Sequence, residues 1–267
     1  MAKRIAVVFD SAGTLLHMYR VAKEPSTGDI LENIESTAIV ARKNGCGLVA
    51  LNTEKEIILS SRRDMFLFEF IKKHGVSIGI SCSKGKFTPE VAFEVIRGSS
   101  LLMGDVHDVL EAVTIRCPDS IYFAAGLIVD SKARRIPYVL STGGQVFSKT
   151  SQTIQLLHAM EVDMYIASGD RMSSLEQLAE FINIPPERVF AFADPFMKEK
   201  VVFELKSRYE KVVMVGDGIN DILALRAADI GIMTVQQGDK RPEELRDAAD
   251  VVLKDIIKVV DVVKGLQ

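Results

Sequence analysis

Acidic, hydroxyl and amine side chains stand in four short stretches far apart along the chain. The residues are Asp10, Ser168, Lys198, Asp217 and Asp221. Carboxylate oxygens are the ligands that Mg²⁺ prefers, and a lysine with a hydroxyl can neutralise and hydrogen-bond the oxygens of a phosphoryl group. Taken singly, each residue would be a turn residue, a helix cap or a surface lysine. Taken together, they indicate a magnesium and phosphate site, provided that the fold brings them to one place.

The predicted strands give a reason to expect these five residues close together in the fold. Asp10 directly follows the uninterrupted apolar run 5–9, and Ser168 and Asp217 also follow apolar runs. Such runs predict strands buried on both faces, as in a parallel sheet covered by helices. Ligands of open parallel sheets bind beyond the carboxyl ends of the strands. Lys198 lies near the start of a predicted helix, where the helix dipole disfavours a cation, so we expect an acidic group to hold it.

The order of predicted elements divides the chain into two parts. From about residue 148, strands alternate with helices, which specifies a mostly parallel sheet with helices on both faces. Residues 18–135 instead contain neighbouring strands, which indicates an α+β module. We therefore expect an α/β, Rossmann-like domain formed by residues 1–17 and 136–267, with an inserted α+β cap domain of residues 18–135.

Some elements of the cap are expected from local pattern. Apolar residues predict strands at 36–43, 47–52 and 56–61, and a helix that ends at Gly75. Thr88 before a proline predicts the first residues of another helix.

Composition narrows the class of partner. The chain has 267 residues, 48% of them hydrophobic and 26% charged, with a formal net charge of −3, so neither nucleic acid nor a membrane surface is expected as the main partner. No apolar run reaches the roughly 20 residues of a membrane-spanning helix, and the first residues lack a signal-peptide pattern. We therefore expect a cytoplasmic protein. Its cysteines are expected to be free thiols, because Cys46, Cys82 and Cys117 are odd in number and widely spaced.

Four motifs in the chain resemble those of the haloacid-dehalogenase superfamily. They are DSAGT at 10–14, SGD at 168–170, PxxK at 195–198 and MVGDGINDILALRAADIGI at 214–232. Within that superfamily they look most like the phosphorylation domain of P-type ATPases, in which the corresponding motifs are DKTGT, TGD, PxxK and MVGDGINDAPAL.

The resemblance implies an Mg²⁺-dependent phosphohydrolase in which Asp10 becomes an aspartyl phosphate. It implies that Ser168 and Lys198 hold the phosphoryl oxygens, and that Asp221 supports Lys198. The expected phosphate-binding residues are Thr14, Gly169 and Asn220. The expected metal ligands are Asp10, Asp217 and the backbone carbonyl of Ala12.

One position departs from the family pattern. Most phosphatases of the superfamily have a second Asp two residues after the nucleophile, which protonates the leaving group, and here that residue is Ala12. Substrates whose leaving group needs no proton are therefore expected. These are phosphorylated small molecules such as ATP-like anhydrides or activated phosphomonoesters. Ion pumping is not expected, since no actuator motif or membrane helix is present in the sequence.

Two alternatives follow from the same residues. Phosphonoacetaldehyde hydrolases share the pattern D-x-A-G-T and use a cap lysine to form a Schiff base. The candidate lysines here are Lys23, Lys43, Lys55, Lys84 and Lys86. The second alternative is a regulatory module that binds phosphate with little turnover.

Overall fold

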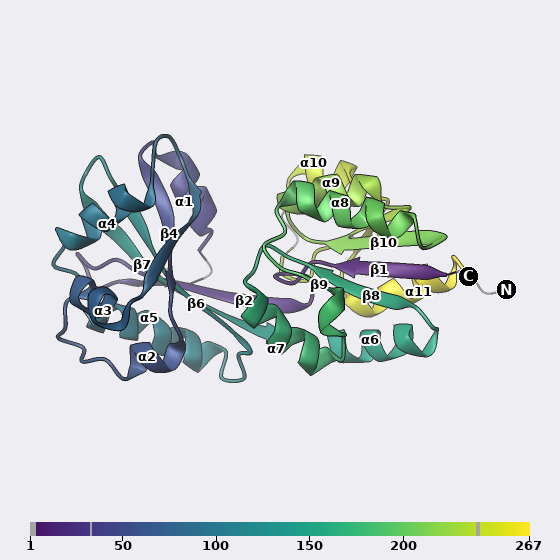
Figure 1. Ribbon diagram of the computed structural model, residues 1–267, viewed down its shortest axis with the longest axis horizontal. Helices are drawn as coiled ribbons and strands as arrows, with labels where there is room; N and C mark the ends of the chain where they lie inside the picture. Colours follow the sequence, from purple (N-terminus) through teal and green to yellow (C-terminus); the bar gives the residue numbers. More distant parts are fainter. Residues whose placement is uncertain (1–3, 33, 239–240) are drawn as a thin grey trace. The chain divides into compact units, whose positions relative to one another are not determined.

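The apolar run Ile5–Phe9 forms strand β1, and every residue of this strand is buried. The computed structural model describes residues 4–32, 34–238 and 241–267. They form two compact units (Figure 1). One consists of the chain up to Met18 together with Gly144–Gln267, and the other consists of Tyr19–Gly143.

β1 is an inner strand of a parallel sheet in the first unit. The strands of this sheet are β1 (Ile5–Phe9), β8 (Asp163–Ala167), β9 (Val189–Phe190), β10 (Lys211–Gly216), β11 (Ile230–Thr234) and β12 (Val251–Leu253). Their order is β12-β11-β10-β1-β8-β9, and every pair in it is parallel. The parallel α/β sheet expected from the sequence is confirmed.

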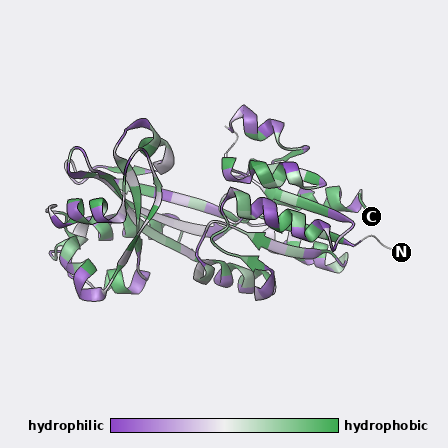
Figure 2. Cartoon of the chain, turned by 45° about the horizontal axis from the view of Figure 1, so that its top comes forward, coloured by the Kyte–Doolittle hydropathy of each residue, from purple (hydrophilic) through white to green (hydrophobic). Residues whose placement is uncertain are grey.

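Helices cover both faces of this sheet, because its strands are apolar on both sides (Figures 1 and 2). They are α6 (Thr150–Ala159), α7 (Met172–Ile182), α8 (Pro195–Lys206), α9 (Ile222–Ala227), α10 (Glu243–Asp247) and α11 (Val259–Lys264), with short 3₁₀ turns η1 (Pro186–Arg188), η2 (Ile219–Asp221) and η3 (Ile256–Lys258). α8 and α9 lie on one face, where Ala6 and Val8 of β1 pack with Leu205 and Leu225. α6 and α11 lie on the other face.

The topology puts the end of β1 at the point where the chain changes direction across the sheet. After β1, the chain adds β8 and β9 on one side, and then β10, β11 and β12 on the other. A crevice forms outside the carboxyl ends of the strands at such a switch point, and ligands bind there. Asp10 directly follows β1 at this position.

The second unit contains a separate sheet and its own core. Its sheet has the order β3-β2-β7-β6-β4-β5. The strands are β2 (Leu16–Lys23), β3 (Ile30–Glu32), β4 (Cys46–Asn52), β5 (Ser77–Ser83), β6 (Tyr122–Asp130) and β7 (Arg135–Val146), and the helices are α1 (Ser36–Arg42), α2 (Lys55–Leu59), α3 (Leu67–His74), α4 (Pro89–Arg97) and α5 (Met103–Arg116). The pairs of β2 with β3, and of β4 with β5 and β6, are antiparallel. Thr88 caps α4 by accepting a hydrogen bond from Val91 N, as expected.

Two strand predictions in this unit are wrong. Residues 36–43 contain helix α1, and 56–61 overlap helix α2. A short apolar run does not distinguish a strand from a buried helical turn. Val40 is the buried residue of α1 and Ile58 that of α2, so each segment buries one side chain of a helical turn rather than alternate residues of a strand.

The boundary between the two units also differs from the expected one, because of strand β7. The two units divide between Gly143 and Gly144, whereas the sequence analysis expected the division between 135 and 136. The difference arises because β7, which begins at Arg135, belongs to the second sheet. Within the described residues, no helix is long and apolar enough to cross a membrane.

Candidate active site

The turn after β1 holds Asp10 in a buried position. Asp10 N donates to Val215 O at 2.9 Å and so extends the pairing of β1 with β10 by one residue. The chain then turns tightly, because Ser11 O accepts hydrogen bonds from the backbone N–H groups of the residues at 14, 15 and 16. Asp10, the first residue of this turn, is 4% exposed.

Gly13 in this turn cannot be replaced by a residue with a side chain. Its φ is +80°, and a Cβ atom built on it would lie 2.0 Å from Oδ2 of Asp217. The backbone of the turn at residues 10–16 (the Asp10 turn) therefore packs directly against the Asp217 carboxylate. Glycine is required here both for its conformation and for this close approach.

We predict that Gly13→Ala weakens Mg²⁺ binding at least tenfold and lowers the melting temperature. The left-handed conformation costs an alanine roughly 1–2 kcal/mol, and displacement of Asp217 adds to this. Gly28→Ala is the matched control, because Gly28 has φ +82° with nothing within 4 Å of the added Cβ, so it carries only the backbone cost. Calorimetric titration with Mg²⁺ and thermal unfolding measure both effects. Equal results for the two variants would contradict the proposed packing of Asp217.

The Lys198 side chain extends from the first turn of α8 to the Asp10 turn. Asp194 caps this helix by accepting from Met197 N at 2.8 Å, and Pro195 occupies its first turn. The Lys198 side chain is 0% exposed, and its Nζ donates to Asp10 Oδ1 at 2.5 Å and to Asp221 Oδ1 at 2.7 Å. The acidic groups expected to hold this lysine are therefore Asp10 and Asp221.

Asp221 has hydrogen-bond partners on both carboxylate oxygens. Oδ1 accepts from Lys198, and Oδ2 accepts from Asp217 N at 3.0 Å and Gly218 N at 2.9 Å. A Cβ on Gly216 would lie 2.5 Å from this carboxyl group, so glycine at 216 leaves the space for it. The GDGIND sequence thus folds around one buried carboxylate.

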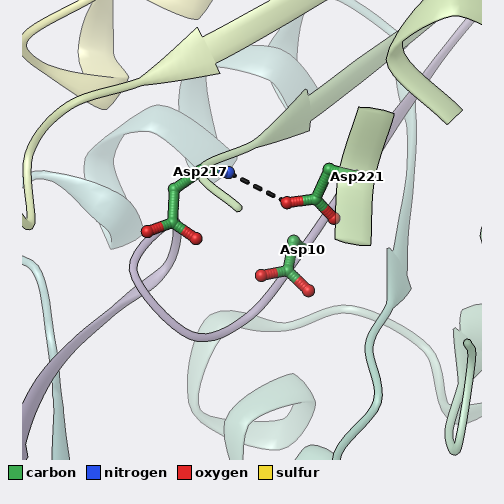
Figure 3. Close-up of side chains that lie close together, drawn as sticks. All are labelled: Asp10, Asp217 and Asp221. Atoms are coloured by element: carbon green, nitrogen blue, oxygen red, sulfur yellow. Dashed lines mark hydrogen bonds between the residues drawn. The ribbon is translucent and has the colours of Figure 1, made fainter. Parts of the chain in front are cut away.

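The carboxylates of Asp10, Asp217 and Asp221 converge at the ends of β1 and β10 (Figure 3). One oxygen of each lies within 4.8 Å of the others. Burial raises the pKa of Asp10, and the neighbouring carboxylates add to this against the opposing charge of Lys198. Burial alone would lower the pKa of Lys198, but the two carboxylates outweigh it and raise this pKa. The lysine therefore stays protonated, and the cluster still has an excess of negative charge.

Ser168 lies beside the Asp10 turn. It belongs to a hydrogen-bond network that the sequence analysis did not predict. It is 2% exposed, and its Oγ lies 2.7 Å from Ser11 Oγ. Both hydroxyls donate to Asp170 Oδ2, Ser11 at 2.6 Å and Ser168 at 3.0 Å. Ser11 and Asp170 were present in the DSAGT and SGD motifs, but nothing in the sequence indicated that they form a hydrogen bond.

The remaining predicted phosphate and metal residues differ in exposure. Thr14 is fully buried, and its Oγ1 has no hydrogen-bond partner in the part of the chain that the structure describes. Ala12, in the Asp10 turn, is partly exposed. Gly169, just after β8, and Asn220, in η2, are exposed. Their predicted roles remain predictions.

Arg241 is a residue at the site that the sequence analysis missed. Its Nη2 lies 2.6 Å from Asp217 Oδ2, and the two side chains are 19% and 14% exposed. It lies outside the four motifs, beyond β11, so no local signal linked it to Asp217.

Three of the five candidate cap lysines are bonded to other groups of the second unit. Burial alone would lower the pKa of Lys23, but hydrogen bonds to Asp105 and Asp108 outweigh it, and the pKa is raised. A lysine that attacks a carbonyl needs a lowered pKa instead. Lys43 pairs with Asp130, and Lys84 donates to Ala41 O.

Known proteins resemble this chain over most of its length. A soluble P-type ATPase-like phosphatase of Methanocaldococcus jannaschii is 28% identical over 262 residues, which are 98% of this chain and 93% of that protein. A chloroplastic copper-transporting ATPase of Arabidopsis thaliana is 25% identical over 188 residues, which are 70% of this chain and 16% of that protein. Among solved structures, the catalytic domain of the CPx-ATPase CopB-B matches 98% of this chain and 90% of that chain, at 16% identity and a TM-score of 0.49.

A family model also covers most of the chain. The model of the haloacid dehalogenase-like hydrolases matches residues 6–229, a range that includes Asp10, Ser168, Lys198 and the GDGIND sequence. The resemblance inferred from the four motifs is therefore confirmed. The chain belongs to the haloacid dehalogenase-like hydrolase family.

Proposed function

We propose that the protein is an Mg²⁺-dependent phosphohydrolase that transfers a phosphoryl group to Asp10 and then releases it to water. The observation that carries this proposal is the buried Lys198 ammonium, bonded to both Asp10 and Asp221 next to Asp217. A carboxylate attacks a phosphate dianion only when positive charge offsets their repulsion. The name of the archaeal relative, a phosphatase that matches the chain over nearly its full length, supports the same activity.

The donor set of the acidic cluster fits Mg²⁺. All three side chains offer carboxylate oxygens, the hard ligands that Mg²⁺ requires. Asp221 already uses both oxygens for Lys198 and two backbone amides, so we assign the metal to Asp10, Asp217 and the Ala12 carbonyl. The bound ion would supply positive charge for the oxygens of the phosphoryl group.

The protein's own groups account for the remaining chemistry. One Asp10 oxygen accepts the Lys198 hydrogen bond, which orients the carboxylate and leaves its other oxygen to attack phosphorus. The Ser168 hydroxyl turns from Asp170 to donate to a phosphoryl oxygen. The Gly169 and Asn220 backbones and the unpartnered Thr14 hydroxyl are further donors in this proposal.

The leaving group is the point at which this site differs from most related phosphatases. Ala12 has no proton to donate, so an alkoxide of a sugar phosphate departs slowly, whereas an aryl oxide or ADP leaves unaided. We therefore propose ATP-like anhydrides or activated phosphomonoesters as substrates, and a cytoplasmic location where such compounds are present.

Comparison of two substrates tests this function. In the presence of Mg²⁺, kcat/KM for p-nitrophenyl phosphate is expected to exceed that for glucose 6-phosphate about 100-fold or more, the usual contribution of a general acid. Chelation of the metal should stop both reactions. Ala12→Asp supplies the missing acid and should reduce the ratio by raising sugar-phosphate hydrolysis. Equal rates in the unmodified protein would contradict the proposed preference, and no turnover of any substrate would favour a phosphate-binding module.

A further inference from the structure

Arg241 contacts an acid that we have assigned to the metal. Its Nη2 donates to Asp217 Oδ2 at 2.6 Å. The Nε of Arg241 is buried and has no hydrogen-bond partner among the described residues. A guanidinium that binds a carboxylate through one nitrogen, with another left unsatisfied, is held less firmly than a bidentate pair.

Residues 234–237, on the amino-terminal side of Arg241, are bonded to the Asp10 turn and to β2. Thr234 Oγ1 donates to Gly13 O at 3.3 Å, and Gln236 Nε2 donates to Thr14 O at 3.0 Å. The amide of Gln237 accepts from the Met18 N–H at 2.7 Å and donates to the carbonyl of the same residue at 3.1 Å. Thr234, the last residue of β11, and Gln236 are therefore bonded to the turn after Asp10, and Gln237 is bonded to β2.

The chain on the carboxyl-terminal side of Arg241 is fixed. Arg241 precedes Pro242, which restricts its backbone to extended conformations. Pro242 leads directly into α10, where Leu245 is 0% exposed. Pro242 and α10 therefore hold the chain that follows Arg241, and its guanidinium lies within reach of Asp217.

The positive charge of Arg241 affects the attraction of the carboxylate cluster for a metal ion. Among the described residues, the carboxyl groups of Asp10, Asp217 and Asp221 lie together with the positive charges of Lys198 and Arg241. Without Arg241 the cluster would be more negative by one charge and would attract a divalent cation more strongly.

We propose that Arg241 competes with Mg²⁺ for Asp217 and so sets the Mg²⁺ concentration at which the active site fills. The inference rests on the proposed function, because it takes Asp217 as a metal ligand. In the ion-free protein Arg241 neutralises Asp217. When Mg²⁺ binds, Arg241 either leaves this carboxylate or remains beside it and repels the ion, and both effects lower the affinity for the metal.

Direct binding of metal to the protein without substrate tests this inference. Calorimetric titration with Mg²⁺, and titration with Mn²⁺ followed by electron paramagnetic resonance, are expected to give about tenfold tighter binding for Arg241→Gln than for the unmodified protein. Arg226→Gln is the control, since it removes one positive charge from an exposed position of the same unit. Thermal unfolding gives a second readout: Arg241→Gln should be less stable without metal and gain more from Mg²⁺.

The outcomes separate the inference from the proposed function. If the unmodified protein binds no divalent ion, the metal assignment itself fails. If it binds the ion and Asp217→Asn abolishes binding, Asp217 is a metal ligand as assigned. The affinity of the Arg241→Gln variant for the ion then tests whether Arg241 competes with it. Unchanged or weaker binding in Arg241→Gln would overturn the inference, and weaker binding would make Arg241 a residue that positions Asp217 for the metal.

Discussion

Asp10→Asn is expected to abolish both turnover and covalent labelling of the protein. An amide does not attack phosphorus, so we expect a loss of at least about 10⁴-fold in kcat, as when a nucleophile is removed in other enzymes. The amide has the shape of the carboxyl group, and its oxygen can still accept the Lys198 hydrogen bond. The variant therefore removes the reaction while it preserves the packing of the site.

Acid-quenched samples provide the measurement. The unmodified protein is incubated with [γ-³²P]ATP and Mg²⁺, quenched in acid and tested for label on the chain. Label should accumulate, because Ala12 supplies no base for the attack of water on the aspartyl phosphate. Asp261→Asn, the same change at an exposed position, is the control and should be labelled normally. Label on Asp10→Asn equal to that on the control would show that another residue is the nucleophile.

The same variant gives a prediction about stability. The pKa of Asp10 is raised in the folded protein, above all by burial. A group with a raised folded-state pKa stabilises the fold while it is protonated and loses this contribution as the pH rises through that pKa. Above the ordinary aspartate pKa and without metal, burial of the Asp10 carboxyl group therefore opposes folding, and the Asp10→Asn variant, which is neutral at this position, should melt at the same temperature or higher. A lower melting temperature in chelator would contradict this reading of the site.

The carboxylate cluster could be predicted because Asp10 and Asp217 directly follow strands, and Asp221 lies four residues after Asp217 in the same motif. Apolar runs identify β1, β8 and β10, and the rule for parallel sheets then brings their carboxyl ends together. Two features of the sequence, periodicity and motif spacing, thus sufficed for Asp10, Asp217 and Asp221. The structure brings Lys198 to the same place, where a helix start predicted only that some acid would hold it.

Other parts of the site depend on tertiary contacts that leave no local pattern. The contact of Arg241 with Asp217 joins the GDGIND motif to a residue that lies beyond β11, 24 positions later in the chain. The Ser11 and Asp170 contact joins the ends of two strands that are neighbours in the sheet but far apart in the chain. In the second unit, α1 was predicted as a strand, because short apolar segments do not determine their own secondary structure.

Lys198→Met is expected to destabilise the fold as well as to stop the reaction. Methionine has a similar length but no charge, so Asp10 and Asp221 would remain buried without their cation. Removal of one member of a buried ion pair costs about 3–5 kcal/mol, a large part of the stability of an ordinary domain. Activity should fall roughly 10³-fold or more, because nothing replaces the ammonium beside the phosphoryl group.

The pH dependence of stability gives this variant a distinctive signature. The pKa of Lys198 is raised in the folded protein, so its contribution is fully present below the ordinary lysine pKa of 10.5 and is lost only as the pH rises through the higher folded value. The unmodified protein should thus show no loss from this group between pH 5 and pH 9. Lys198→Met should instead recover stability as the pH falls toward 5, when one of the two facing carboxyls takes up a proton.

A double variant separates the structural role of Lys198 from its catalytic role. Lys198→Met with Asp221→Asn removes one positive and one negative charge, so the buried cluster returns to its original balance. Stability measured by urea unfolding should recover most of the loss of the single variant, since paired residues of one network do not contribute additively. Activity should not recover, because the ammonium that offsets the charge of the phosphoryl group is still missing. Recovery of both properties would mean that Lys198 serves only to neutralise Asp221, whereas recovery of neither would mean that its alkyl chain and hydrogen bonds, rather than its charge, hold the site together.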